Sequence, residues 1–86
     1  MAQQRRTALI TGAGRNIGRA VALGLAQDGF DVVLNGSTDR AACEGVAEAA
    51  RGLGVAAEVV MGDVGSAAEC ARIAAVAIAR FGAVDL

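Results

Sequence analysis

The sequence predicts an α/β fold in which a parallel sheet is covered by helices on both faces. Short apolar runs of strand length alternate three times with segments of helical periodicity. The strand-length runs are apolar throughout, as strands buried on both faces are. Each connection is also long enough to form a helical crossover between parallel strands. At 86 residues, the chain makes at most one small domain.

The first strand is expected over residues 6–11, where a short apolar run ends at Gly12. A helix should follow over residues 16–28, with Gly29 as its left-handed stop. Helical spacing predicts that the inward face of this helix consists of Ile17, Val21, Gly24 and Leu25.

The second strand is expected over residues 31–35, and Ser37 or Thr38 can cap a helix that continues to about Arg51. The spacing of apolar residues predicts that this helix buries Ala42, Val46, Ala49 and Ala50.

The third strand is expected over residues 55–61. Ser66, with Glu69 three positions later, forms a capping-box pattern that opens a helix to about Arg80. Residues 84–86 should begin a fourth strand.

Composition excludes several functions for these residues. The chain has no His, Tyr or Lys, and all eight basic residues are Arg. This rules out His-based or Tyr-based acid–base catalysis, a Lys Schiff base and a phosphate loop that needs its Lys. A net charge of −1 and only two aromatic residues predict neither a nucleic-acid partner nor an anionic membrane partner.

The same composition bears on location and on metals. No signal peptide is visible, and no apolar run approaches the roughly 18–20 residues of a membrane span. Cys43 and Cys70 lack metal-ligand spacing, so we expect no metal site and no disulfide. Free thiols indicate a reducing compartment, and a cytoplasmic protein is predicted.

The most informative segment is the glycine-rich turn between the first strand and the first helix, Thr11-Gly-Ala-Gly-Arg-Asn-Ile-Gly-Arg19. Glycines there let the backbone approach a pyrophosphate, which then rests on the helix N-terminus. The second and third helices carry acids near their starts, whereas this helix carries arginines there. A dinucleotide site is therefore predicted, the alternative being an ordinary turn with incidental glycines. The predicted contacts are Gly12, Gly14, Arg15, Asn16, Ile17 and Gly18.

The spacing of this turn discriminates among families. The general dinucleotide fingerprint needs a third glycine where Ile17 stands. The pattern T-G-x-x-x-N-x-G instead resembles the T-G-x-x-x-G-x-G motif of the short-chain dehydrogenase/reductase family. Asn16 departs from that motif, but Asn is the non-glycine residue that best tolerates left-handed backbone.

The resemblance extends along the whole chain. Asp63-Val64 is similar to the family's Asp-Val pair after the third strand, where the carboxylate contacts adenine. A turn with a helix cap is the alternative interpretation of Asp63. The closing run, residues 81–86, is similar to the family's approach to its fourth strand.

Dinucleotide-binding sheets of the doubly wound Rossmann type have the strand order 3-2-1-4-5-6, with strands 1 and 4 at the centre. Ending in the fourth strand would leave a central strand with an open edge. We therefore expect residues 1–86 to be the N-terminal half of a single Rossmann-type domain that continues beyond residue 86. A self-sufficient miniature domain is the alternative.

The end of the second strand bears on the choice of cofactor. An acid about 20 positions past the glycine motif would bind the ribose 2′-hydroxyl and favour NAD. Here the strand ends in Asn35, Asp31 lies at its other end, and Asp39 falls within the predicted helix. A 2′-phosphate would therefore meet no repulsion, so NADP(H) is favoured over NAD(H). The predicted contacts in this region are Arg15, Asn35, Gly36, Ser37 and Thr38, with Asp63 and Val64 at the adenine.

The resemblance implies an NADP(H)-dependent oxidoreductase that transfers a hydride to or from a small carbonyl or alcohol, similar to 3-oxoacyl-carrier-protein reductases. The family places its catalytic Tyr, Lys, Ser and Asn later, so no catalytic residue is assigned in this chain. A homodimer or homotetramer through later helices is also implied. The alternatives are a non-catalytic NADP-binding regulatory or redox-sensing module, and a methyltransferase or flavoprotein. Asn35 argues against the last two, which typically place an acid there.

Overall fold

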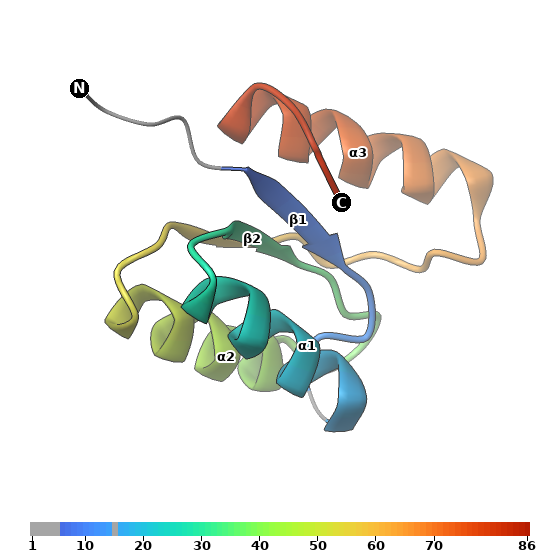
Figure 1. The fold of residues 1–86 in the computed structure, drawn as a ribbon. Helices are drawn as coiled ribbons and strands as arrows, with labels where there is room; N and C mark the ends of the chain where they lie inside the picture. The colour runs from blue at the N-terminus through green and yellow to red at the C-terminus, as the bar shows by residue number, and fades with distance from the viewer. Residues whose placement is uncertain (1–5, 15) are drawn as a thin grey trace.

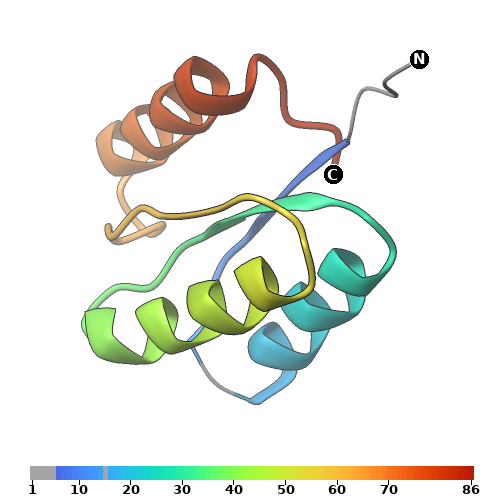
Figure 2. The ribbon, with the colours of Figure 1, turned by 90° about the vertical axis from the view of Figure 1, so that its left-hand side faces the viewer.

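The computed structural model describes residues 6–14 and 16–86, and it confirms the α/β class. The parallel sheet has the order β1-β2-β3, and Thr7 pairs with Asp31 while Val32 pairs with Ala57. Two helices cover one face of the sheet and the third covers the other (Figures 1 and 2). The elements are β1 (Thr7–Ile10), α1 (Asn16–Gln27), β2 (Asp31–Leu34), α2 (Arg40–Gly52), β3 (Ala57–Val59) and α3 (Ala67–Phe81).

Two apolar cores lie on opposite faces of the sheet, and alternate residues of β2 contribute to them. Val32 and Leu34 are buried beneath α1 and α2, whereas Val33 packs with Ile73 and Ala77 of α3. This alternation follows from the two-residue period of a strand. The same alternation fixes the face of the sheet on which each side chain at the end of β2 lies.

The inward face predicted for α1 is mostly wrong, since of the predicted residues only Leu25 is half-buried and packs against the core. Ile17 is 80% exposed and Val21 46% exposed, and the buried residues are Ala22 and Ala26. A helix with two neighbouring apolar stripes can bury either one, and the stripe with small side chains lets α1 lie close to the sheet and to α2. On α2 the prediction is confirmed for Val46 and Ala50, and the other two buried residues are Cys43 and Ala47 instead of Ala42 and Ala49.

The chain segment after α3 returns to the outer edge of β1 (Figure 1). The amides of Asp85 and Leu86 donate to the Thr7 carbonyl at 2.8 and 3.2 Å, and the Leu9 amide donates to the Leu86 carbonyl at 3.0 Å. Alternating donation of this kind is the pattern of parallel neighbours. Residues 84–86, where a fourth strand was predicted, therefore lie along the side of β1 opposite β2, although they do not form a strand in this structure.

Candidate dinucleotide-binding site

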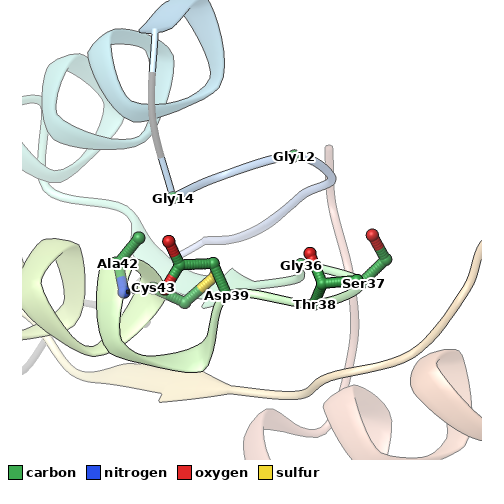
Figure 3. Close-up of a pocket in the computed structure, with 8 residues that line it drawn as sticks. All are labelled: Gly12, Gly14, Gly36, Ser37, Thr38, Asp39, Ala42 and Cys43. Atoms are coloured by element: carbon green, nitrogen blue, oxygen red, sulfur yellow. Dashed lines mark hydrogen bonds between the residues drawn. The ribbon is translucent and has the colours of Figure 1, made fainter.

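The loops that follow β1 and β2 meet at the carboxyl edge of the sheet. Two hydrogen bonds of 2.9 Å join them, from the Ala13 amide to the Asn35 carbonyl and from the Asn35 amide to the Ile10 carbonyl. Between the loops lies a hollow of about 120 Å³ (Figure 3). Its lining residues are Gly12, Gly14, Gly36, Ser37, Thr38, Asp39, Ala42 and Cys43.

The glycine-rich turn has the backbone that its sequence predicts. Gly12 has φ +60°, and Asn16 adopts φ +55°, the left-handed conformation that its amide side chain tolerates. A Cβ at Gly12 would have no neighbouring atom within 4 Å, so the turn leaves an open surface there. A Cβ at Gly18 would stand 2.0 Å from the Gly12 carbonyl oxygen. Gly18 is therefore required for the turn to pack on α1.

The N-terminus of α1 carries no acidic residue in its first turn. Asn16, Ile17 and Gly18 form the start of this helix, next to the hollow but not among the residues that line it. Arg15 lies outside the described residues. Unpaired amides and the helix dipole make such an end attractive to an anion.

The cap of α2 differs from the prediction. Asp39, and not Ser37 or Thr38, is the N-cap, and its Oδ1 accepts a hydrogen bond of 3.0 Å from the Ala42 amide. Asp39 thereby lies in the wall of the hollow, beside the exposed Ser37 and Thr38 (Figure 3). The expectation that Asp39 falls within the helix and away from the site is wrong, because the cap residue is the point at which the loop joins the helix.

Asn35 was predicted to contact a cofactor, but its side chain has other partners. It is 2% exposed, and its Nδ2 donates to the carbonyls of Val60 at 2.9 Å and Gly62 at 3.2 Å. Both amide hydrogens are thus used within the protein. Asn35 ties the end of β2 to the end of β3 and does not line the hollow.

Gly36 and Cys43 are in close contact at the base of the hollow. A Cβ built on Gly36 would lie 2.7 Å from the Cys43 sulfur, and Cys43 is 1% exposed. Burial raises the pKa of the Cys43 thiol, and the nearby carboxylates of Asp39 and Glu44 raise it further. Ala42 and Cys43 also line the hollow, although they were not predicted to do so. Their position in the first turn after the loop was the available signal.

Asp63 and Val64 lie in the loop between β3 and α3, outside the lining of the hollow. One carboxylate oxygen of Asp63 accepts from the Gly65 amide at 2.8 Å, and its carbonyl accepts from the Ser66 amide at 3.1 Å. These bonds match the turn interpretation of Asp63. Val64 is exposed.

An ion pair supports the same loop. Arg72 binds both carboxylate oxygens of Glu69, at 3.1 and 3.2 Å, and also donates to the Met61 carbonyl. The hydrogen bond and the charge of Arg72 hold the pKa of the Glu69 carboxyl below its usual range. Ser66 caps α3 as predicted, accepting from the Glu69 amide at 3.4 Å.

Two kinds of feature are absent from the described parts of the chain. Within residues 6–14 and 16–86, no group of three or more His, Cys, Asp or Glu side chains could hold a metal ion. In the same ranges no helix combines the length and the apolar character that a membrane crossing requires. Cys43 and Cys70 are free, and they lie on helices that cover opposite faces of the sheet.

A βαβ arrangement with a glycine turn at the carboxyl edge defines a nucleotide-binding class of fold. The model of the family described as short chain dehydrogenase matches residues 6–86. The chain therefore belongs to the short-chain dehydrogenase family, and the resemblance found in the sequence is confirmed.

Individual named proteins and a solved structure that are similar to this chain agree with the family assignment. Versicolorin reductase 1 of Aspergillus parasiticus is 38% identical over 81 residues, covering 94% of this chain and 31% of that protein. The 3-oxoacyl-[acyl-carrier-protein] reductase FabG of Staphylococcus epidermidis is 37% identical over 83 residues, with 94% and 33% covered. The crystal structure of acetoin dehydrogenase YohF from Salmonella typhimurium superposes with a TM-score of 0.86 at 35% identity, covering 93% of this chain and 33% of that one. The chain thus spans about a third of the length of these relatives.

Proposed function

We propose that this chain is the N-terminal, cofactor-binding part of an NADP(H)-dependent oxidoreductase, which transfers a hydride to or from a carbonyl or alcohol of a small molecule. The observation that carries the proposal is the hollow at the carboxyl edge, where the open surface of Gly12 faces Ser37 and Thr38 across the two loops. NADP(H), when bound, supplies the hydride chemistry; the residues described here bind and orient it.

The pyrophosphate would lie over the glycine turn. Gly12 leaves open space above the backbone, and the first turn of α1, whose amides can act as donors, contains no acidic residue. These are the features by which a helix N-terminus holds phosphate groups. Asn16 provides the left-handed backbone of the turn, and Gly18 lets the turn pack closely on α1, so both hold the amides in place for that contact.

The adenosine half would lie over the loop after β2. The hydroxyls of Ser37 and Thr38 offer donors for a 2′-phosphate, and no carboxylate lies at the end of β2 itself. Asp63 lies on the neighbouring loop, and one of its carboxylate oxygens is engaged by the turn, which leaves the second for adenine. The hydroxyls of Ser37 and Thr38 support NADP(H) as the cofactor, although the Asp39 carboxylate lies in the wall of the same hollow.

The remaining parts of the proposal concern the whole protein. Relatives about three times as long support a domain that continues beyond residue 86, and it would contain the catalytic residues and the contacts of a homodimer or homotetramer. The names of those relatives, two reductases and a dehydrogenase, support a carbonyl or alcohol substrate. A cytoplasmic location belongs to the same proposal.

A titration of NADPH into the protein, followed by nicotinamide fluorescence, tests the binding site. Gly12→Ala should weaken NADPH at least tenfold, because a methyl group would enter the space left for the pyrophosphate. Gly54→Ala is the matched control, since Gly54 also has positive φ (+97°), has open space around it and lies away from the hollow. Equal affinity in folded Gly12→Ala and Gly54→Ala proteins would contradict the assignment.

A further inference from the structure

We propose that Arg72 is a positioning residue for the adenosine half of the cofactor. It holds the loop after β3 in place from the side of α3, and so raises the affinity for the dinucleotide without contacting it. The inference rests on the proposed function, in which Asp63 and Val64 of this loop contact the adenine. Arg72 lies in α3, outside the motifs that predict the site.

The two residues before Asp63 are bound from two directions. The Gly62 amide donates at 3.0 Å to the carbonyl of Gly36, which lines the hollow. From the side of α3, the Arg72 guanidinium donates to the Met61 carbonyl. Because consecutive Cα atoms are only about 3.8 Å apart, bonds to these two residues determine where Asp63 lies relative to the hollow.

The bonds that Asp63 makes itself shape the turn but do not place it. Its carboxylate accepts from the Gly65 amide at 2.8 Å, and its carbonyl accepts from the Ser66 amide at 3.1 Å. Both partners belong to the same turn, and Asp63 and Val64 are exposed. Such a turn keeps its shape when it moves as a unit. Its position therefore depends on the contacts of the residues that precede it.

Arg72 is directed at the loop by Glu69, whose carboxylate oxygens accept from its guanidinium at 3.1 and 3.2 Å. A guanidinium has enough donors to bind a carboxylate twice and a carbonyl as well. Both side chains lie against the loop backbone, since a Cβ built on Gly62 would stand 2.6 Å from Arg72 Nη2 and 2.9 Å from Glu69 Oε1. Gly62 therefore lets α3 approach the loop this closely.

The expected effect of Arg72 is on binding more than on stability. The side chains of Arg72 and Glu69 are 46% and 40% exposed, and exposed ion pairs contribute little to folding. The bond to the Met61 carbonyl instead restricts where the loop lies. Without it, the loop occupies the binding position for a smaller fraction of the time. The dissociation constant of every ligand that uses the loop then rises in inverse proportion to that fraction.

Titrations of NADPH and of adenosine 2′,5′-bisphosphate test the proposal in Arg72→Met and Arg80→Met. Arg80 is the matched control, because it lies on the same helix, pairs with Glu58 of β3 at 3.1 Å and is 49% exposed. Arg72→Met should weaken both ligands by the same factor, about fivefold, as expected for one hydrogen bond. Arg80→Met should leave both affinities within about twofold, although the two substitutions should shift the midpoint of thermal unfolding by similar, small amounts.

Two further variants separate position from charge. Arg72→Lys keeps a donor for the Met61 carbonyl and should return the affinities to within about twofold of the unaltered protein. Glu69→Gln leaves the charge of Arg72 without its partner. A direct attraction between Arg72 and the ligand phosphates would then raise the affinity, whereas a positioning role predicts equal or lower affinity, because the acceptor that directs Arg72 is weaker.

Hydrogen exchange measures the position of the loop directly. In Arg72→Met the Gly62 amide, which donates to Gly36, should exchange about threefold faster or more. The Val60 amide donates to the Leu34 carbonyl at 3.0 Å and should keep its rate, because β3 stays paired with β2. A role in general stability would accelerate both amides alike.

The outcomes separate the two proposals. Unchanged affinities in Arg72→Met overturn the role of Arg72 and leave the proposed function standing, as do equal losses in Arg72→Met and Arg80→Met, or a gain in Glu69→Gln. Failure of the unaltered protein to bind NADPH overturns the proposed function itself. If Arg72→Met does not fold, Gly62→Ala displaces the guanidinium from the Met61 carbonyl instead, and should weaken both ligands equally.

Discussion

The side-chain amide of Asn35 donates a hydrogen bond of 2.9 Å to the carbonyl of Val60, joining the end of β2 to the end of β3. The second amide hydrogen goes to the Gly62 carbonyl, and the main-chain carbonyl of Asn35 accepts from the Ala13 amide. One residue thus contacts all three loops at the carboxyl edge of the sheet. The relative position of these loops depends on it.

Asn35→Asp should destabilise the protein by about 3 kcal/mol or more, because a buried carboxylate would face two carbonyl oxygens in place of two donated hydrogen bonds. Urea unfolding measures the loss. The same substitution places an acid near the end of the second strand, where an acid favours NAD in the general fold. We expect no switch to NADH, because the side chain is directed to the loop after β3. A stable, NADH-selective Asn35→Asp protein would contradict this account.

Gly18→Ala and Gly24→Ala should have opposite effects on stability, although both lie in α1. A Cβ at position 18 would stand 2.0 Å from the Gly12 carbonyl oxygen, so the turn must move, at a cost of about 2 kcal/mol or more. A Cβ at position 24 meets nothing within 4 Å, and Ala there should stabilise the helix by about 0.5–1 kcal/mol. Thermal unfolding measures the stability of each variant against that of the unaltered protein. Equal stability would show that the turn is not packed on the helix as described.

Arg15→Ala should weaken NADPH more than NADH. This prediction comes from the sequence, in which Arg15 is the basic residue of the glycine-rich turn and is available to a 2′-phosphate. Arg19→Ala, which removes the same charge at an exposed position of α1, is the control. Binding titrations with both cofactors measure the difference. Equal losses for NADPH and NADH would show that Arg15 does not contact the 2′-phosphate.

The two cysteines should differ strongly in reactivity. Cys70 is exposed, whereas Cys43 is buried and burial raises the pKa of its thiol, so little reactive thiolate forms there at neutral pH. A thiol reagent at pH 7 should label Cys70 first and Cys43 only slowly. Mass spectrometry of the labelled peptides gives the order, and faster labelling of Cys43 would contradict its burial.

The same shift predicts a loss of stability in alkaline solution. The pKa of the Cys43 thiol is raised in the folded state, so the protonated thiol contributes to the free energy of unfolding. This contribution is fully present below the unfolded-state pKa, and it is lost as pH rises through the folded-state pKa. In Cys43→Ala the decline of stability at high pH should therefore be shallower. Urea unfolding at a series of pH values measures both slopes.

The parts of the fold that depend on local chemistry could be predicted from the sequence. Asn16 takes left-handed backbone because of its own side chain, and Ser66 caps α3 because its hydroxyl reaches an amide three residues on. The apolar runs likewise predict the order of strands and helices.

Features decided by packing between distant segments could not be predicted in this way. Helical spacing does not show whether α1 buries Val21 or Ala22, since each lies on an apolar side of the helix, about 100° apart, and the choice depends on what α1 packs against. The position of Asp39 could not be predicted for a related reason. Which of Ser37, Thr38 and Asp39 caps α2 depends on the path of the loop from β2 to the helix. The partners of Asn35 lie 25 and 27 residues away and leave no local sign.

The segment beside β1 has a consequence for the kinetics of folding. The Thr7 amide donates to the Asp85 carboxylate across 78 residues, whereas the Asn35 side chain reaches the Val60 carbonyl across 25. Closing a longer loop costs more chain entropy. Pairing of β2 with β3 should therefore form before residues 84–86 bind to the edge of β1. In pulsed hydrogen exchange during refolding, the Val32 amide, which donates to Ala56, should become protected before the Leu9 amide, which donates to Leu86.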